Sequence, residues 1–309
     1  MRAALCRELG TPEVVTVEDV TAPAPADGMV RVRVEAAAVN FPDVLIVAGN
    51  YQMKADPPFV PGSEFAGVLD TGERVFGSTF VGAFAEELFV SPASLTPIPD
   101  GVESTIAAGF GVAHRTAYHV LRSVAQVQPD ERVVVLGAGG GVGLAAVQLA
   151  AVLGAEVIAV ASSDEKLAVA RAFGAAITVN SRDGELRAAL GKNDVVVDPV
   201  GGELAEPALR SLRYGGRFVT VGYASGTIPR IPLNLVLLKG ITVMGFQFID
   251  FATHQPEARA RDEAELLALL ADGRAYPHIG ARFALDDAAA ALRYVADGRA
   301  IGKVVIDVG

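Results

Sequence analysis

The chain is poor in the residues that build disulfides and metal centres. Its 309 residues include one cysteine, Cys6, and four histidines. A single thiol excludes an internal disulfide and any zinc site made of several thiolates, and it is compatible with a reducing compartment. The histidines show no spacing typical of a ligand cluster, so we expect structural roles for all of them: His114, His119, His254 and His278. The sequence therefore predicts no bound metal.

Positive charge is also scarce. There are 26 Lys and Arg residues against 36 Asp and Glu, which gives a formal net charge of -10 and a pI near 5.0. Such a chain lacks the broad basic surface that nucleic acid or an anionic membrane would need. An anionic ligand must therefore find a local positive site. The N-terminal segment has arginine at positions 2 and 7 with no apolar run behind them, so we expect no secretory signal and a cytoplasmic protein.

One uncharged run, residues 133–155, exceeds the length of about 20 residues that spans a bilayer. It carries glycine at positions 137, 139, 140, 141, 143 and 154. Clustered glycines are typical of a turn between two buried elements, not of a membrane helix. We expect no membrane association.

Hydrophobic patterning indicates two domains, as the length of the chain suggests. Residues 30–39 alternate as VRVRVEAAAV, and short β-like runs follow at 67–75 and 85–90. Apolar runs then alternate with helical patterns, at residues 133–136, 157–160, 177–179, 195–197, 217–221 and 241–244. This alternation is typical of a doubly wound parallel sheet. We predict an α/β protein with a β-rich domain at 1–115 and 250–309 and a Rossmann domain at 116–249.

The segment VVVLGAGGGVGLAAVQLA reads as a strand, a glycine turn and a helix. Ala138, Gly140 and Gly143 have the spacing of the dinucleotide fingerprint, with alanine in the first glycine position. The fingerprint exists because the turn is tight, the backbone approaches a pyrophosphate and the helix packs closely on the sheet. Gly141 and Val142 complete the turn, and the helix N-terminus then offers free N–H groups to the phosphates. We predict dinucleotide binding here, and a purely structural turn is the alternative.

The end of the following strand indicates which dinucleotide is preferred. An acidic residue there would bind the adenosine ribose and repel a 2′-phosphate, but this chain has Ala161. Ser162, Ser163 and Lys166 follow and offer hydroxyl donors and a cation. The sequence therefore predicts NADPH. In the alternative interpretation the serines only cap the next helix and Lys166 is a solvated charge.

The order of these motifs resembles that of the zinc-independent, zeta-crystallin-like quinone oxidoreductases of the medium-chain dehydrogenase/reductase family. The matching segments are AAVNFPDVLIVAGNY, PGSEFAGV, AGGGVGLAAVQLA, DPVGG, GRFVTVG and IGKVVI. Val134, Ala151, Leu45 and Ser181 depart from residues that are usual in that family or in some of its members. The resemblance implies a GroES-like first domain and an NADPH-dependent enzyme. It also implies a homodimer joined through the apolar edge strand at residues 241–245.

The resemblance further implies which residues form the site. Asn40, Asp43 and Tyr51 are expected at the nicotinamide end, with Asn40 and Tyr51 as candidate hydrogen-bond donors to a developing oxyanion. Alternatively, Asn40 and Asp43 only stabilise a turn and a short helix. Glu64 is expected to brace the first domain. Thr116 and Gly222 are further expected cofactor contacts, and Arg182 could compensate for Ser181, which stands where some relatives have a tyrosine.

The expected chemistry follows from the absent metal ligands. Ser63 stands where zinc-dependent relatives have a histidine, and no cysteine lies near Asp43. Without a Lewis acid, alcohol oxidation is disfavoured, whereas hydride delivery to an electron-poor acceptor is not. The leading hypothesis is two-electron reduction of quinones by NADPH. Two alternatives stay open: reduction of an activated C=C bond in an enal, enone or enoyl thioester, and a non-enzymatic, structural role for an NADPH-binding protein.

Overall fold

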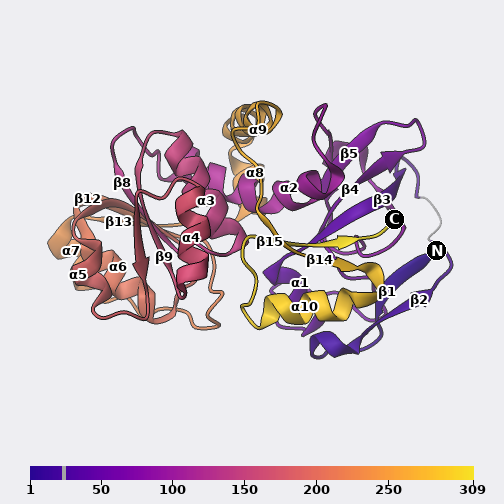
Figure 1. Ribbon diagram of the computed structural model, residues 1–309, viewed down its shortest axis with the longest axis horizontal. Helices are drawn as coiled ribbons and strands as arrows, with labels where there is room; N and C mark the ends of the chain where they lie inside the picture. The colour runs from indigo at the N-terminus through magenta and orange to yellow at the C-terminus, as the bar shows by residue number, and fades with distance from the viewer. Residues whose placement is uncertain (23–25) are drawn as a thin grey trace. The chain divides into compact units, whose positions relative to one another are not determined.

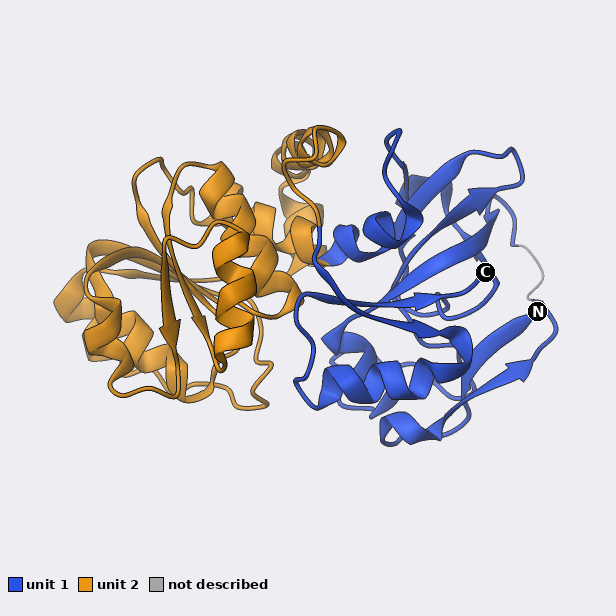
Figure 2. Ribbon diagram, viewed as in Figure 1, with its two compact units in different colours: residues 1–112, 277–309 blue, residues 113–276 orange. Residues whose placement is uncertain are grey.

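The computed structural model describes residues 1–22 and 26–309, which form two compact units (Figure 2). The first unit holds residues 1–112 and 277–309, and the second holds residues 113–276. The boundaries that we expected from the sequence lay after residues 115 and 249, so the second unit extends further along the chain than expected. The additional segment contains two helices, α8 (Phe248–His254) and α9 (Pro256–Ala271).

A six-stranded parallel sheet forms the centre of the second unit, with the strand order β10, β9, β8, β11, β12, β13 (Figure 1). These strands are β8 (Arg132–Leu136), β9 (Glu156–Ala161), β10 (Ile177–Asn180), β11 (Asn193–Asp198), β12 (Leu212–Thr220) and β13 (Thr242–Gly245). Each coincides with a predicted apolar run, which confirms the doubly wound class. Since all are parallel, their carboxyl ends lie along one edge, and the strand order switches between β8 and β11.

Helices connect these strands. They are α3 (Gly141–Val152), α4 (Asp164–Ala172), α5 (Leu186–Leu190), α6 (Ala205–Ser211) and α7 (Leu233–Lys239). The uncharged run at residues 133–155 thus folds into most of β8, the glycine turn and α3, as the glycines predicted. In the described parts of the chain, no helix is both long and apolar enough to cross a membrane.

A second, larger sheet organises the first unit, in the order β14, β15, β3, β4, β5, β7, with β6 paired to β3. Its strands are β3 (Val30–Val39), β4 (Glu64–Leu69), β5 (Arg74–Ser78), β6 (Glu87–Val90), β7 (Leu95–Pro97), β14 (Ile279–Ala284) and β15 (Lys303–Asp307). β1 (Arg2–Cys6) and β2 (Val15–Asp19) form a separate pair, and α1 (Phe41–Val47) and α10 (Ala288–Ala296) complete the unit. The run expected at 67–75 is a hairpin of β4 and β5. β15 pairs with β3, the strand that leads into Asn40, and β4 pairs with the other edge of β3, so the C-terminal strand lies one strand away from Glu64.

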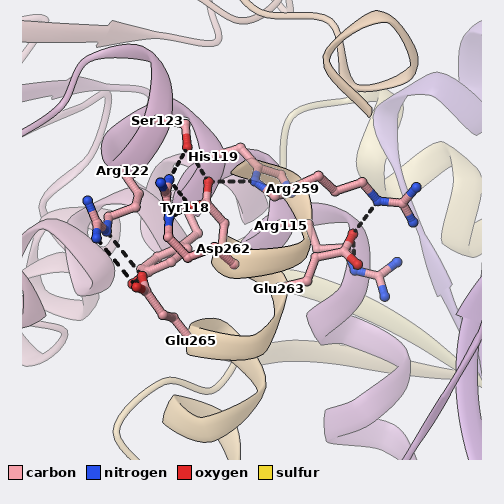
Figure 3. A network of polar contacts seen from close by, with 10 residues as sticks. Arg115, Tyr118, His119, Arg122, Ser123, Arg259, Asp262, Glu263 and Glu265 are labelled. Carbon is pink, nitrogen blue, oxygen red and sulfur yellow. Dashed lines mark hydrogen bonds and ion pairs between the residues drawn. The ribbon is translucent and has the colours of Figure 1, made fainter. Parts of the chain in front are cut away.

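A buried polar network holds α9 in the second unit (Figure 3). Asp262 of α9 accepts hydrogen bonds from His119 Nδ1 at 3.0 Å and from Ser123 Oγ at 2.5 Å. His119 ends α2 (Ser104–His119), and Ser123 lies in the π-helical turn Val120–Val124 that follows. The ring of His119 also packs against Phe251 of α8, with centroids 4.7 Å apart. This histidine is structural, and its contacts explain why α8 and α9 belong to the second unit.

Candidate functional site

The glycine turn between β8 and α3 takes its tight bend at Gly137, where φ is +62°. Ala138 follows without a positive φ, and its N–H donates to Val160 O at 2.9 Å. The residue that needs the left-handed conformation is therefore the one before the first fingerprint position. This explains why alanine at position 138 does not interrupt the turn.

Close packing of α3 on β8 depends on Gly143. A Cβ atom at this position would lie 2.1 Å from Gly137 O, which no side chain could tolerate. Gly140 is the N-cap of α3 and contributes no side-chain cap. The first N–H groups of a helix have no partner within it, and here Gly141 and Val142 are half-exposed. Backbone N–H groups at the half-exposed start of a helix fit the pyrophosphate of a dinucleotide.

Two cations lie where β9 and β10 end. The stem of Lys166 lies against the glycine turn, since a Cβ atom at Gly139 would be 2.6 Å from Lys166 Cβ. Arg182 follows β10, where Ser181 N donates to Ala161 O at 2.8 Å. Burial lowers the pKa of Lys166, and the positive charge of Arg182 lowers it further. A phosphate dianion between these side chains would relieve their mutual repulsion.

The serines beside this pair have a second role. Ser163 is the N-cap of α4, and its Oγ accepts a hydrogen bond from Lys166 N at 3.4 Å. The helix-cap interpretation of Ser163 therefore holds. Ser162 is half-exposed directly after Ala161, which ends β9 without an acidic side chain. Capping and phosphate binding are compatible, because the cap uses one lone pair of the Ser163 hydroxyl and leaves its O–H free to donate.

In the first unit, Asn40 and Asp43 lie together at the start of α1. Asp43 Oδ2 accepts a hydrogen bond from Asn40 N at 2.7 Å, so the expected helix-start role is present. The side chain of Asn40 has other partners. Its Oδ1 accepts from Lys303 Nζ at 2.6 Å, and its Nδ2 donates to Glu64 Oε2 at 3.0 Å. The second amide hydrogen of Asn40 has only a 3.5 Å contact, with Ala38 O.

Glu64 braces this region, as expected. It is fully buried, and its Oε1 accepts a hydrogen bond from Val112 N at 2.6 Å. Tyr51 is half-buried and packs against the hydrophobic core of the same unit. In the second unit, Thr116 lies on α2 and Gly222 follows β12, and both are half-exposed.

Sequence reasoning missed two features of the site region. Lys303 was recognised only as part of the IGKVVI segment, although it is 4% exposed and reaches both Asn40 and Glu64. Asp198 and Thr220 are register partners at the carboxyl ends of β11 and β12. Asp198 Oδ2 and Thr220 Oγ1 are buried and make no hydrogen bond within the described part of the chain. Burial raises the pKa of Asp198, although the N–H groups of its turn oppose this. The available signal was their position at predicted strand ends, since Asp198 directly follows the run at 195–197 and Thr220 is the second-last residue of the run at 217–221.

The chain combines a GroES-like β-rich unit with a doubly wound sheet that carries a dinucleotide turn. This combination defines the class of two-domain dehydrogenases and reductases. Comparison with known sequences agrees. Residues 26–100 match the family described as alcohol dehydrogenase GroES-like domain, and residues 141–268 match the family described as zinc-binding dehydrogenase. No group of three or more His, Cys, Asp or Glu side chains that could hold a metal ion occurs among the residues that the structure describes.

Individual relatives define the family more closely. The chain is 39% identical to quinone oxidoreductase-like protein 2 of Bos taurus, over 99% of this chain and 92% of the relative. It is 30% identical to the human quinone oxidoreductase, over 99% and 97% of the two chains. The structure of the Thermus thermophilus quinone oxidoreductase, described alone and with NADPH, matches with a TM-score of 0.90, 35% identity and full coverage of both chains. The chain therefore belongs to the quinone oxidoreductases of the medium-chain dehydrogenase/reductase family.

Proposed function

We propose that this protein is an NADPH-dependent, metal-independent oxidoreductase that reduces quinones by two electrons. The observation that carries the proposal is the pair formed by Lys166 and Arg182 beside an intact dinucleotide turn, in a chain with Ser63 where a metal-binding histidine would stand. The relatives named quinone oxidoreductase, some solved with NADPH, support both parts.

Different residues of this protein would bind the cofactor and orient the acceptor. Bound NADPH would supply a hydride, which an electron-poor ring accepts without a Lewis acid. The N-terminus of α3 would hold the pyrophosphate, and Lys166, Arg182 and Ser162 the 2′-phosphate. Asn40 would present its remaining amide hydrogen to the acceptor oxygen, and Tyr51 would offer a second donor.

Reduction of an activated C=C bond is the second candidate. It has support from a relative, because the chain is 37% identical over 94% of its length to the spectinabilin polyketide synthase system protein NorB of Streptomyces orinoci. The match covers only 14% of that relative. Enoyl reduction needs the same hydride and also a proton at carbon.

An absorbance assay of NADPH consumption separates the candidates. Parallel reactions would contain a benzoquinone, a naphthoquinone, an enal, an enone and an enoyl thioester. We expect the highest kcat/KM with a quinone. A higher value with an enoyl thioester would favour the second candidate, and no NADPH consumption with any acceptor would favour the non-enzymatic role.

We also propose that the protein is a cytoplasmic homodimer. β13 is an edge strand, and apolar residues stand exposed on it and on the neighbouring helix α7. Leu233, Leu237 and Leu238 are 78%, 81% and 74% exposed, and Val243 is 41% exposed. Apolar side chains next to unpaired strand N–H and C=O groups favour pairing with a second copy. The cytoplasmic part rests on Cys6, which is a buried free thiol.

A further inference from the structure

Four polar side chains are buried together in the first unit: Asn40, Asp43, Glu64 and Lys303. All are 8% exposed or less. Lys303 Nζ lies 2.6 Å from Asn40 Oδ1 and 2.9 Å from Glu64 Oε2. Burying charges requires compensation, so the balance of charge within this cluster determines which group carries a proton.

The two carboxyl groups are compensated unequally. Glu64 receives an ion pair with Lys303 and N–H donors from Asn40 and Val112. Asp43 receives the backbone N–H of Asn40 at Oδ2, while its Oδ1 makes no hydrogen bond of ordinary geometry within the described residues. With one ammonium for two carboxyls, Asp43 is the group that is most costly to ionise.

The surroundings of Asp43 also favour its protonated form. Burial raises its pKa to about 6, against the opposing effects of the Asn40 N–H, the Ser63 hydroxyl and the Lys303 charge, and the Glu64 charge adds to the rise. These are the polar and charged groups that face it from the start of α1, from the segment before β4, from β4 and from β15. Asp43 can therefore hold or release a proton near neutral pH.

Ser63 is the more exposed neighbour of the Asp43 carboxyl. It is half-buried, whereas Asp43 is 1% exposed, and its hydroxyl is close enough to influence the Asp43 carboxyl. A hydroxyl both donates and accepts, so it can pass a proton along without acquiring a lasting charge.

We propose that Asp43 stores the proton that the reduced acceptor takes up and passes it on through the Ser63 hydroxyl, while the Lys303 ammonium balances the negative charge that stays on Asp43. This inference rests on the proposed reduction of quinones. Hydride transfer delivers two electrons and leaves a hydroquinone monoanion, which must gain one proton. The Asp43 O–H bond breaks, Ser63 gives up one proton and receives another, and an O–H bond forms on the hydroquinone. Asp43 is left as a carboxylate, and solvent protonates it again by the same route.

The stored proton can be detected without turnover. A carboxyl whose pKa is raised on folding, here from 3.8 to about 6, contributes stability that is present below pH 3.8 and lost as the pH rises through 6. Denaturant unfolding of the wild type should show this loss between pH 4 and 7. Asp43→Asn should remove it, because asparagine keeps the shape and an acceptor for the Asn40 N–H but does not titrate.

Turnover with a benzoquinone tests the route. We expect kcat of the wild type to fall as the pH rises through about 6, and Asp43→Asn to lower kcat at pH 5 by about a hundredfold and flatten the profile. Ser63→Ala should also lower kcat strongly while the unfolding titration of Asp43 persists. NADPH affinity should stay the same in both variants.

Matched controls are available in the second unit. Asp262→Asn changes another fully buried aspartate, and Ser211→Ala removes another buried hydroxyl, so both should keep the wild-type pH profile of kcat. A wild type that reduces no quinone would overturn the proposed function. An active wild type whose pH profile is unchanged by Asp43→Asn, or whose kcat is unchanged by Ser63→Ala, would overturn the proton store alone.

Discussion

Replacing Lys166 with alanine should weaken NADPH binding and leave NADH binding almost unchanged. Lys166 and Arg182 lie close enough that the charge of Arg182 lowers the pKa of Lys166. Each charged hydrogen bond to the 2′-phosphate contributes about 1.5 to 3 kcal/mol, and about 1.4 kcal/mol corresponds to tenfold in affinity. Lys166→Ala should therefore weaken NADPH by roughly ten- to a hundredfold.

The paired charges add a second expectation. Part of the NADPH binding energy comes from relief of the repulsion between Lys166 and Arg182, and either single substitution already removes this part. The Lys166→Ala, Arg182→Ala double variant should therefore lose less NADPH binding free energy than the sum of the two single variants. Ala161→Asp should invert the preference by repelling the phosphate and binding the ribose hydroxyls.

Calorimetric titration of both cofactors measures these effects. Arg171→Ala is the matched control, because Arg171 is also a cation of α4 but bonds to Thr178 Oγ1 at 2.6 Å. It should bind both cofactors like the wild type. Equal affinity of the wild type for NADPH and NADH would refute the reasoning, and it would mean that Ser163 and Lys166 only build the start of α4.

Three other predictions follow from the structure. Purified protein should contain no stoichiometric zinc and should keep its activity in a chelator, since cysteine and histidine are missing at the positions where zinc-dependent relatives bind the metal. Elemental analysis showing one essential zinc per chain would contradict this. Val243→Asp together with Leu237→Asp should shift the proposed dimer to monomer in sedimentation, and an unchanged sedimentation coefficient would rule out pairing through β13. Gly143→Ala should impair cofactor binding or lower the thermal unfolding temperature, because its Cβ would meet Gly137 O at 2.1 Å, and a variant that binds NADPH and unfolds like the wild type would contradict this.

Local patterns predicted the second unit well because its strands are buried and its turn has a fixed chemistry. The short valine run of β8 predicted a strand, and these residues are fully buried. The fingerprint spacing predicted close packing at Gly143, where a Cβ atom would meet Gly137 O. The position of the tight bend differs from the one that the fingerprint assigns. The fingerprint attributes it to position 138, but the left-handed residue is Gly137, because the chain turns directly after the last residue of β8.

Local sequence patterns could not predict contacts between distant segments of the chain. α9 has an ordinary helical pattern, and only the pairing of Asp262 with His119, 143 residues earlier, shows which unit it joins. Lys303 is the stronger case. Nothing in a short apolar strand shows that its lysine is buried, because a lysine at a strand end is usually solvated. Its role follows from the pairing of β15 with β3 and of β3 with β4, which brings the ammonium to Asn40 and Glu64. The glutamate alone would bury an unpaired charge, and the asparagine alone could turn its amide either way. The lysine removes both possibilities, so the geometry of the candidate catalytic amide depends on a residue 263 positions away in the sequence.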